Sequence, residues 1–550
     1  MTAAGPRVQP LGDRGLVVEV AADASPAATA RVLGAEAALA GLPGVVETAP
    51  GMCAVLLVYD PGLVAFADLA AQAARAVAEA PPARLEAGPL VEIPVAYGGA
   101  AGPDLEEVAR ACGLGAGDVV RLHSEQDYLA FMLGFAPGYA YLGELHPALR
   151  LPRRSSPRAR VPSGSVAIAD RFTGIYPHET AGGWHILGRT SVRVFDPMRS
   201  EPFLLRPGAR VRFRPVTAEV LASAPLSGDG GTIGPSGAAE AADAAPLERP
   251  ALEVVRPGLL TTVQDMGRPG WRRFGIPASG ALDPGALGAA NAAVGNPAGA
   301  ACLELTFPGP VLRALADIEV AVAGADLGAH CDGRPMPAER AVAMRANAEI
   351  TFTAPRRGQW AYLAVSGGID APLVFGSRSA NARGGLPGLA GRPLRAGDVL
   401  GRGEGAGALP AGTPRADAAP EGAPVRVVLG PQTDAFQPDA VPALLGAAYE
   451  VTLQRDRSGM RLRGPALRHR SGAQVFSDGL LPGTIQVPGD GQPIVILADG
   501  PTTGGYPRIA TVVTADLARV AQAAPGTKVR FVAVEVDRVP DGRILCSSDA

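Results

Sequence analysis

Short apolar runs separated by glycine and proline dominate this chain. "GLVVEV" and "CAVLLVYD" are typical of the runs, and 71 glycines with 53 prolines interrupt them. Glycine and proline end regular structure, and apolar runs this short favour strands over helices. The pattern therefore predicts a mostly β architecture with added α+β, carrying only a few helices.

A helical period appears in few places, and each has recognisable end signals. We predict helices near Pro26–Ala40, Leu63–Ala80, Asp104–Cys112, Pro284–Val294 and Ala515–Ala523. Asp104 and Asp283 are the predicted N-caps of the third and fourth. Gly113 and Gly295 follow the ends of those two helices, as expected of C-terminal signals.

The order of these elements predicts several domains, because 550 residues exceed what one hydrophobic core usually holds. Residues 1–86 alternate strands and helices, which predicts a small α+β domain. Residues 224–250 are rich in Gly, Ser, Ala and Pro, and we predict a flexible linker there. The predicted units are 1–86, a β-rich domain at 87–223, the linker, and a second β-rich region at 251–540 with lobes 251–400 and 424–540, then a tail at 541–550.

One phrase occurs twice. "VPSGSVAIADRFTGIYP" begins at Val161, and "LPGTIQVPGDGQPIVILADGPTTGGYP" begins at Leu481. Both run from Pro through Gly-(Ser/Thr)-(Val/Ile) and an apolar strand to Ala-Asp, then to Thr-Gly-x-Tyr-Pro. Polar glycine loops at strand ends are common ligand sites. The repeat predicts two related β units that face each other across a cleft; alternatively, two barrels reuse one favourable turn.

Composition excludes several classes of protein. The net charge is −3, and no basic cluster alternates with aromatic residues, so we expect no nucleic-acid partner. The five cysteines lie far apart without metal-ligand spacing, which fits a reducing cytoplasm. No signal peptide is expected at the N-terminus. No run reaches the ~18 apolar residues of a membrane span, so we expect no membrane partner.

Lys528 is the only lysine. No glycine-rich Walker loop surrounds it, so the chain has no P-loop nucleotide site. It also has no carrier context, so we expect no covalently attached biotin. The sequence contains no Ser-His-Asp ordering, no Gly-x-Ser-x-Gly elbow and no metal-ligand spacing. Positioning and electrostatics are therefore the expected means of catalysis, with no metal.

The first half offers three groups of polar candidates. Glycines in "GFAPGYAYLG" would free backbone N–H groups as donors, or would simply allow tight packing of aromatic residues. Arginines at 153, 154, 158 and 160 would bind a carboxylate at a cleft edge, or lie on a solvated loop. His185 follows Trp184 on a predicted strand, where a structural role is more common than a catalytic one.

The second half places amide, carboxylate and hydroxyl groups in glycine loops. Such groups suit a urea-like or lactam substrate, which carries both N–H donors and a C=O acceptor. Asp499 follows the apolar run "PIVIL", and we expect its carboxylate at the mouth of the cleft, where it would accept a substrate N–H or orient water. The predicted catalytic residues are Asp499, Arg461 and Gln486, and the predicted substrate-binding residues are Arg160, Thr173, Tyr176, Gln264, Asp265, Arg378, Thr503 and Tyr506.

The longer motifs resemble a known family. "GFAPGYAYLG", "SPRARVPSGSVAIA", "TGIYP" and "GGWHILGRT" resemble the B-type component of ATP-dependent 5-oxoprolinase, long labelled as part of an allophanate hydrolase. "TTVQDMGRPGWRRFGIPASGALD", "GSRS", "RDRSGMRLRGP" and "TTGGYPRIATV" resemble the C-type component. The chain is thus similar to a B–C fusion. It departs from the family pattern at Asp170-Arg171-Phe172, at His185 and at Pro501.

The resemblance implies cyclophilin-like β-barrels beside a small N-terminal α+β domain. It also implies ATP-driven opening of 5-oxo-L-proline to L-glutamate, with a separate A-type subunit as partner and ATP as co-substrate. Two alternatives come from the same family. One is a carboxyltransferase component that acts on urea-like amides with carboxybiotin supplied in trans, and the other is a non-enzymatic regulator of a histidine kinase.

Overall fold

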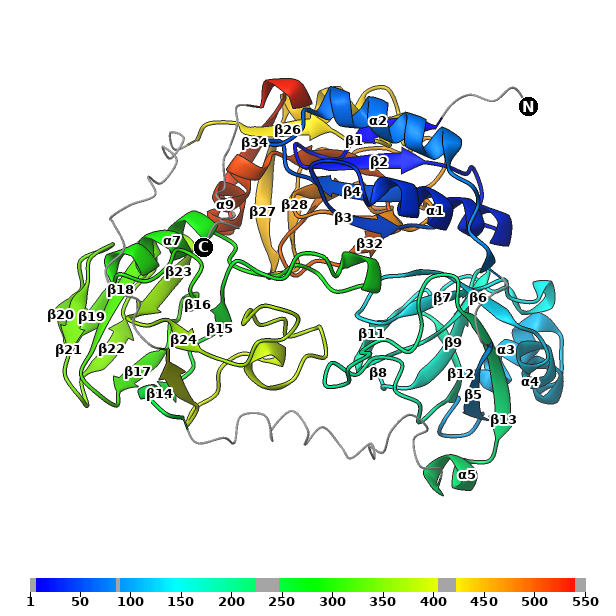
Figure 1. Cartoon of the computed structure of the whole chain (residues 1–550), viewed down its shortest axis with the longest axis horizontal. Helices are drawn as coiled ribbons and strands as arrows, with labels where there is room; N and C mark the ends of the chain where they lie inside the picture. The colour runs from blue at the N-terminus through cyan, green and yellow to red at the C-terminus, as the bar shows by residue number, and fades with distance from the viewer. Residues whose placement is uncertain (1–5, 86–89, 224–246, 404–421, 540–550) are drawn as a thin grey trace.

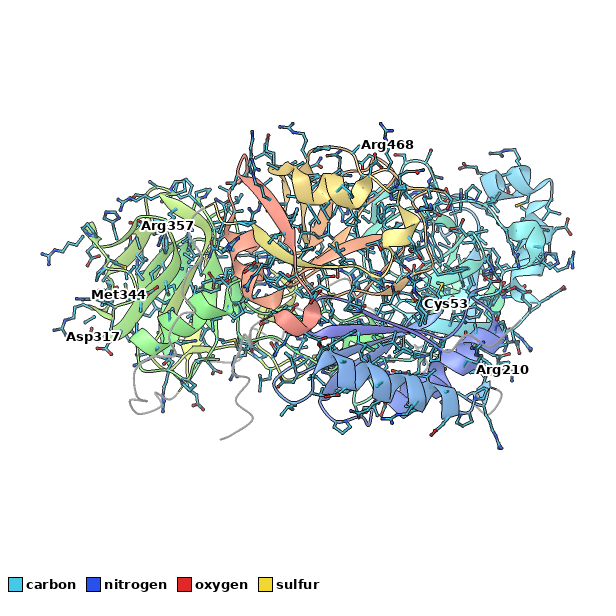
Figure 2. All side chains as sticks on the ribbon, turned by 90° about the horizontal axis from the view of Figure 1, so that it is seen from above. Cys53, Arg210, Asp317, Met344, Arg357 and Arg468 are labelled. Atoms are coloured by element: carbon cyan, nitrogen blue, oxygen red, sulfur yellow. The ribbon has the colours of Figure 1, made fainter. Side chains whose placement is uncertain are left out.

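The computed structural model describes residues 6–85, 90–223, 247–403 and 422–539. The predicted linker lies almost entirely outside these ranges, as does the predicted tail. Strand pairing divides the described chain into four groups, which are coloured in turn blue, cyan-green, green-yellow and orange in Figure 1. The molecule is elongated: in Figure 2, Asp317, Met344 and Arg357 mark one end and Arg210 lies toward the other.

The N-terminal group is a four-stranded antiparallel sheet covered by two helices. Its strand order is β1-β2-β4-β3, and the helices α1 and α2 lie on its outer face in Figure 1. The other face packs on the C-terminal barrel, where Leu11, Val17 and Leu56 meet Leu481. Because both faces are covered, β4 is an almost continuous apolar run. The elements are β1 Arg7–Pro10, β2 Gly15–Glu19, α1 Pro26–Leu39, β3 Val45–Pro50, β4 Ala54–Tyr59 and α2 Phe66–Glu79.

The second group is a closed seven-stranded barrel in the order β10-β7-β6-β13-β5-β12-β9. A two-stranded sheet of β8 and β11 and the helices α3, α4 and α5 flank it. The elements are β5 Leu90–Tyr97, α3 Leu105–Cys112, α4 Ala116–Ser124, β6 Tyr128–Leu133, β7 Ala140–Gly143, β8 Arg158–Val161, β9 Ser165–Ala169, β10 Phe172–Ile175, β11 Thr180–Gly182, β12 His185–Arg189, β13 Arg210–Val216 and α5 Ala218–Ser223.

Asp104 is the N-cap residue of α3, as predicted. Its side chain makes no cap hydrogen bond. Its carboxylate instead accepts hydrogen bonds from the Arg158 guanidinium at 2.6 and 2.9 Å and from the Ile186 amide at 2.7 Å. A buried carboxylate binds a guanidinium fork more strongly than one amide of its own turn. The helix α4 was not predicted, because Gly115 and Gly117 obscure its period.

The third group is a lobe of two packed sheets, with seven strands in the order β20-β19-β22-β17-β14-β25-β24 and five in the order β15-β16-β23-β18-β21. Its helix α7 has the predicted cap, since the Asp283 carboxylate accepts from the Ala286 amide at 3.0 Å. The elements are β14 Pro250–Arg256, β15 Thr261–Gln264, α7 Pro284–Ala293, β16 Cys302–Leu305, β17 Val311–Ala314, β18 Ile318–Asp326, β19 Ala329–Cys331, β20 Arg334–Pro335, β21 Val342–Met344, β22 Glu349–Phe352, β23 Arg357–Val365, β24 Ile369–Asp370 and β25 Val399–Arg402.

The fourth group is a second closed seven-stranded barrel, in the order β26-β33-β30-β31-β28-β27-β34. Helix α9 packs beside β26, and a small sheet of β29 and β32 lies outside the barrel. The elements are β26 Val425–Leu429, α8 Ala440–Gly446, β27 Ala448–Arg455, β28 Gly459–Arg463, β29 Asp478–Gly479, β30 Thr484–Gln486, β31 Ile494–Ile496, β32 Thr503–Gly504, β33 Arg508–Val512, α9 Thr514–Gln522 and β34 Lys528–Ala533.

The two barrels close in the same way. In each, the first strand pairs in parallel with the last, β5 with β13 and β26 with β34, while the other pairs are antiparallel. This shared closure confirms two related β units and the cyclophilin-like barrel class. Among the described residues, no helix is long and apolar enough to cross a membrane.

Candidate functional site

The two halves of the chain, residues 6–223 and 247–539, meet along buried contacts. Arg272 binds Glu47 at 3.0 Å, and both side chains are less than one-tenth exposed. The ring of Phe203 stacks on that of Phe274 with centroids 4.3 Å apart. A buried ion pair and stacked aromatic rings are typical of a permanent interface. The halves therefore form one body.

One of these contacts joins two segments that the sequence singled out. Phe135 lies in the loop between β6 and β7, and its amide donates to Thr503 Oγ1 at 3.1 Å. A Cβ on Gly134 would stand 2.2 Å from the same oxygen, so only glycine permits this approach. Phe135 itself has φ +67°. The predicted glycine loop of the first half thus binds the predicted Thr-Gly-x-Tyr-Pro segment of the second.

Aromatic side chains line the first-half side of this contact. The Phe135 ring meets the rings of Tyr139 and Tyr176 edge-on, with centroids 5.2 and 6.1 Å away. Phe135 is 37% exposed, whereas Tyr176 is 1% exposed. Burial raises the pKa of Tyr176 to about 12, so its phenol stays neutral at physiological pH.

A second contact across the halves is made by His178, two residues after Tyr176 in the chain. The ring Nε2 of His178 lies 2.8 Å from the backbone oxygen of Arg383. The Arg383 side chain binds Asp456 at 2.6 Å. We call the junction formed by these contacts the seam, and its members are Phe135, Tyr176, His178, Arg383, Asp456 and Thr503; Tyr506 follows Thr503 in the same segment.

Asp499 does not lie at an open cleft mouth, which corrects the expectation from sequence. Its carboxylate binds Arg457 through Nε at 2.7 Å and Nη2 at 3.0 Å, and its side chain is 7% exposed. Arg457 also binds Glu304, which in turn accepts a hydrogen bond from Tyr362. Burial alone would lower the pKa of Arg457, but the two carboxylates outweigh it and raise that pKa. Asp499 therefore anchors its segment to the neighbouring lobe.

The other two predicted catalytic residues lie apart from each other. Gln486 is buried and donates through Nε2 to the backbone oxygen of Tyr506 at 3.1 Å, so it supports the segment 503–506 from the outer face of β30. Arg461 binds Asp490 at 2.6 Å on the outer side of the barrel. The arginine of this motif that reaches Asp499 is Arg457, four residues earlier.

The predicted binding residues of the lobe hold loops together. Asp265 accepts hydrogen bonds from the hydroxyls of Ser377 and Ser379 and from the amides of Gly267 and Arg378. Gln264 is fully buried and donates to the backbone oxygen of Ala380 at 3.1 Å. The side chain of Arg378 pairs with Asp370. None of the partners named here for Asp265, Gln264 and Arg378 belongs to the seam.

Two predicted binding residues of the first half, Thr173 and Arg160, also lie outside the seam. Thr173 lies inside the first barrel, where its hydroxyl is 2.9 Å from Nε2 of His123. Arg160 is largely exposed and pairs with Glu179, next to His178 in the chain. Of the predicted site residues, the structure thus brings Tyr176 and Thr503 to the seam, while Tyr506 lies three residues after Thr503 and its backbone is held by Gln486. The sequence argument singled out the glycine loop that holds Phe135 but missed His178 and Arg457.

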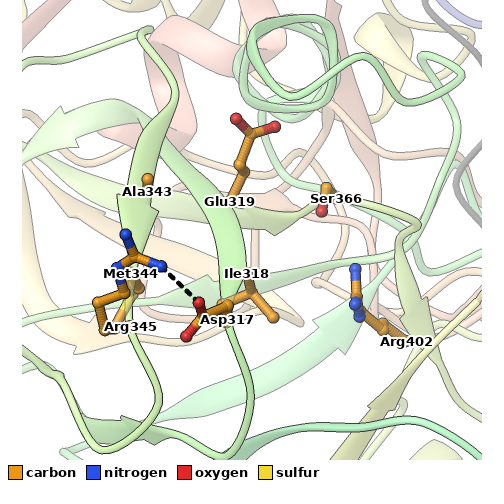
Figure 3. Close-up of a pocket in the computed structure, with 8 residues that line it drawn as sticks. All are labelled: Asp317, Ile318, Glu319, Ala343, Met344, Arg345, Ser366 and Arg402. Atoms are coloured by element: carbon orange, nitrogen blue, oxygen red, sulfur yellow. Dashed lines mark hydrogen bonds and ion pairs between the residues drawn. The ribbon is translucent and has the colours of Figure 1, made fainter.

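Two surface grooves lie away from the seam. One holds about 350 Å³ at the edge of the lobe, where Asp317, Glu319, Arg345 and Arg402 line it and Arg345 pairs with Asp317 (Figure 3). The other holds about 460 Å³ beside the β27–β28 hairpin and includes Arg461. Both grooves are lined by solvent-facing charges, and of the predicted site residues only Arg461 lies in either. Among the described residues, no cluster of His, Cys, Asp or Glu could hold a metal ion.

Family models match both halves. Residues 6–205 match the carboxyltransferase domain, subdomains C and D, and residues 274–533 match subdomains A and B of the same domain. The second half is 37% identical to the C-type component of 5-oxoprolinase from Escherichia coli K12 over 300 residues, which cover 94% of that protein and 53% of this chain. This chain belongs to the family of B-type and C-type 5-oxoprolinase components. The first half is 43% identical to the B-type component from E. coli O157:H7 over 206 residues, 94% of that protein and 37% of this chain.

Both types of component are therefore joined here in one polypeptide, with the B-type part first. A solved structure has the same arrangement: the protein TTHA0988 is 37% identical, has a TM-score of 0.79, and aligns over 94% of this chain and 99% of its own. Urea amidolyase of Lachancea kluyveri is 32% identical over 52% of this chain, but the match covers only 17% of that longer protein.

Three of the residues that depart from the family pattern, Arg171, Phe172 and His185, have structural roles. Arg171 binds Glu144, and it also binds Asp23 at 3.0 Å, which ties the first barrel to the N-terminal sheet. Phe172 packs edge-on against Phe131 and Tyr141. The ring Nε2 of His185 lies 3.0 Å from the backbone oxygen of Pro152. That oxygen can only accept, so His185 donates within the first half, as expected of a structural strand histidine.

Proposed function

We propose that this chain supplies the B-type and C-type components of an ATP-dependent 5-oxoprolinase. The complex would hydrolyse 5-oxo-L-proline to L-glutamate together with a separate A-type subunit. One observation supports this most strongly: each half matches a different component of that one enzyme over 94% of the component's length. The hydrogen bond from Phe135 to Thr503 adds support, because it unites both halves at one place.

The seam suits a small lactam. Its first-half side offers aromatic rings with one neutral phenol, and its second-half side offers the Thr503 segment and the half-exposed phenol of Tyr506. A planar lactam packs on aromatic rings, while hydroxyl groups pair with its N–H and C=O. In this proposal, Gln486 and Asp499 hold the segment 499–506 in place, and the seam residues contact the substrate.

The chain's own residues do not fit an ATP site of the Walker type. Its single lysine, Lys528, is exposed at the start of β34 and has no glycine loop before it. We therefore assign ATP binding to the partner subunit. The same lysine has no carrier context, so the proposal includes no covalently attached biotin.

The test is reconstitution. The purified chain, an A-type subunit and ATP are combined with 5-oxo-L-proline, and glutamate release is measured with each component omitted in turn. We expect turnover only when all are present. Thr503→Val, which removes the acceptor for the Phe135 amide, should lower turnover about tenfold, equivalent to about 1.4 kcal/mol. Arg345→Gln, in the remote groove, should leave it unchanged.

A second function has one specific observation in its favour, the match to urea amidolyase and to carboxyltransferase domains. In that case, the chain would carboxylate a urea-like amide when a biotinylated carrier and its carboxylase are supplied. Carboxylation under those conditions, with no glutamate release in the reconstitution, would contradict the oxoprolinase proposal.

A further inference from the structure

His178 of the first half holds a loop of the second half through one hydrogen bond. Its Nε2 lies 2.8 Å from the backbone oxygen of Arg383, in the loop 381–387 of the lobe. A carbonyl oxygen can only accept a hydrogen bond, so Nε2 carries the proton of the neutral ring and donates it here. The contact therefore selects the tautomer in which Nδ1 carries no proton.

The other ring nitrogen, Nδ1, is covered by the same loop. The residue as a whole is partly exposed, but this atom is buried and has no hydrogen-bond partner among the residues that the structure describes. A Cβ on Gly385 would stand 3.0 Å from Nδ1 and 2.9 Å from Cγ, so the glycine lies directly against this edge of the ring. A proton on Nδ1 would be a buried charged donor without an acceptor, which is costly. The loop must move away before water can solvate that proton.

The charged groups on either side of the ring are engaged with one another. On the first-half side, the carboxylate of Glu179 accepts hydrogen bonds from Arg160 at 2.9 and 3.0 Å. On the lobe side, the guanidinium of Arg383 binds Asp456 at 2.6 Å. Tyr176, two residues before the histidine, stays a neutral phenol because burial raises its pKa to about 12. Neither carboxylate is therefore free to stabilise an imidazolium in the closed contact.

The contact is weakened by acid. Burial lowers the pKa of His178 from 6.5, and the hydrogen bond to the Arg383 oxygen raises it by less. A histidine with a depressed pKa in the closed state binds a proton more readily in the open state. The contact is therefore fully stable above pH 6.5 and loses stability as the pH falls below that value.

We propose that His178 and the loop 381–387 form an acid-released latch between the two halves of the chain. The neutral ring holds the loop, and protonation of Nδ1 favours the state in which the loop has moved away. The buried ion pair of Arg272 with Glu47 contains no histidine, so the halves stay joined while the latch opens. The latch acts in the chain alone and does not depend on the proposed function.

The test is hydrogen–deuterium exchange of the full chain at pH 7 and pH 5, corrected for the pH dependence of the chemical exchange step. The amides of Arg383 and Gly384 report on the loop, since both donate to Asn381 within its turn. Because a proton bound only in the open state would shift the opening equilibrium about 25-fold between these pH values, we expect their protection to fall by at least about threefold and at most about 25-fold.

Two variants identify the responsible group. His178→Gln keeps an N–H donor for the Arg383 oxygen but takes no proton, so the loop should be equally protected at both pH values. His123→Gln is the matched control, because it removes a buried histidine of the first barrel that has no part in this contact. The loss of loop protection at pH 5 should persist in it.

A second measurement titrates the ring directly. The Hε1 resonance of His178, assigned by comparison with His178→Gln, should shift with a midpoint below pH 6.5. A midpoint at or above that value would overturn the proposal. So would unchanged loop protection in the parent chain, an equal loss in His178→Gln, or a loss that disappears in His123→Gln, which would show that the exchange reports unfolding of the first barrel.

Discussion

The two Thr-Gly-x-Tyr-Pro segments have the same letters and opposite surroundings. In the first barrel, Thr173 belongs to β10, which pairs with β9 and β7, and Tyr176 is 1% exposed. In the second half, Thr503 belongs to β32, which pairs with β29 outside the barrel, and Tyr506 is 39% exposed. The first segment is part of a buried core, and the second contacts the other half of the chain.

The difference arises from what surrounds each phrase. The first segment follows β9 after a tight turn at Asp170 and Arg171, so it must continue the barrel. The second follows Asp499, which binds Arg457 of the same barrel, and Arg457 in turn binds Glu304 of the lobe. A repeated motif therefore predicts that two units have related folds, but it does not predict that the two copies of the motif have the same function.

Truncating the two tyrosines should separate the buried segment from the exposed one most clearly. Tyr176→Ala removes a buried ring that packs against Phe135, Tyr139 and the Trp184 backbone, and we expect it to lower the free energy of unfolding by about 3–5 kcal/mol. Tyr506→Ala should cost less than about 1 kcal/mol. Denaturant titration of both variants measures this. Equal losses of unfolding free energy in the two variants would contradict the difference between the two segments.

Neutralising Asp499 tests its anchoring role. Asp499→Asn keeps the shape of the side chain but leaves the buried guanidinium of Arg457 with Glu304 as its only carboxylate. We expect the free energy of unfolding to fall by about 3 kcal/mol, at the lower end for a broken buried ion pair. Activity per folded molecule in the reconstituted complex, measured on the same preparation, should change less than about threefold. A large activity loss at unchanged stability would instead make Asp499 a catalytic residue.

The polar interior of the first barrel predicts a pH dependence. Burial lowers the pKa of His123 from 6.5 to about 3, and its ring lies between Tyr97 and Thr173. Between these values the unfolded chain binds one more proton than the native chain, so stability is full above pH 6.5 and falls as pH drops. At pH 5 the loss from this group is about 2 kcal/mol.

His123→Gln should remove that part of the dependence. The difference in unfolding free energy between pH 7 and pH 5 would then be about 2 kcal/mol smaller than in the parent chain. An unchanged difference would show that His123 is not the group responsible.

The sequence predicted the elements better than it predicted the site. Apolar runs and end signals located α1, α7 and α9 to within a few residues, because local patterns determine helices of this kind. The repeat correctly indicated two related units. The site depends on which distant side chains meet, and local patterns carry no such information. Arg457 and Arg461 look equivalent in "RDRSGMRLR", yet β28 begins between them and directs Arg461 to the outer side of the barrel.

The central claim is that substrate binds at the seam, between the halves. Hydrogen–deuterium exchange of the reconstituted complex, with and without 5-oxo-L-proline and ATP, tests it most directly. We predict slower exchange on substrate addition in peptides from both 133–143 and 499–507, because ligand contact on both sides should stabilise both loops. Protection confined to the groove at 317–319 and 343–345, or to one half alone, would contradict the account.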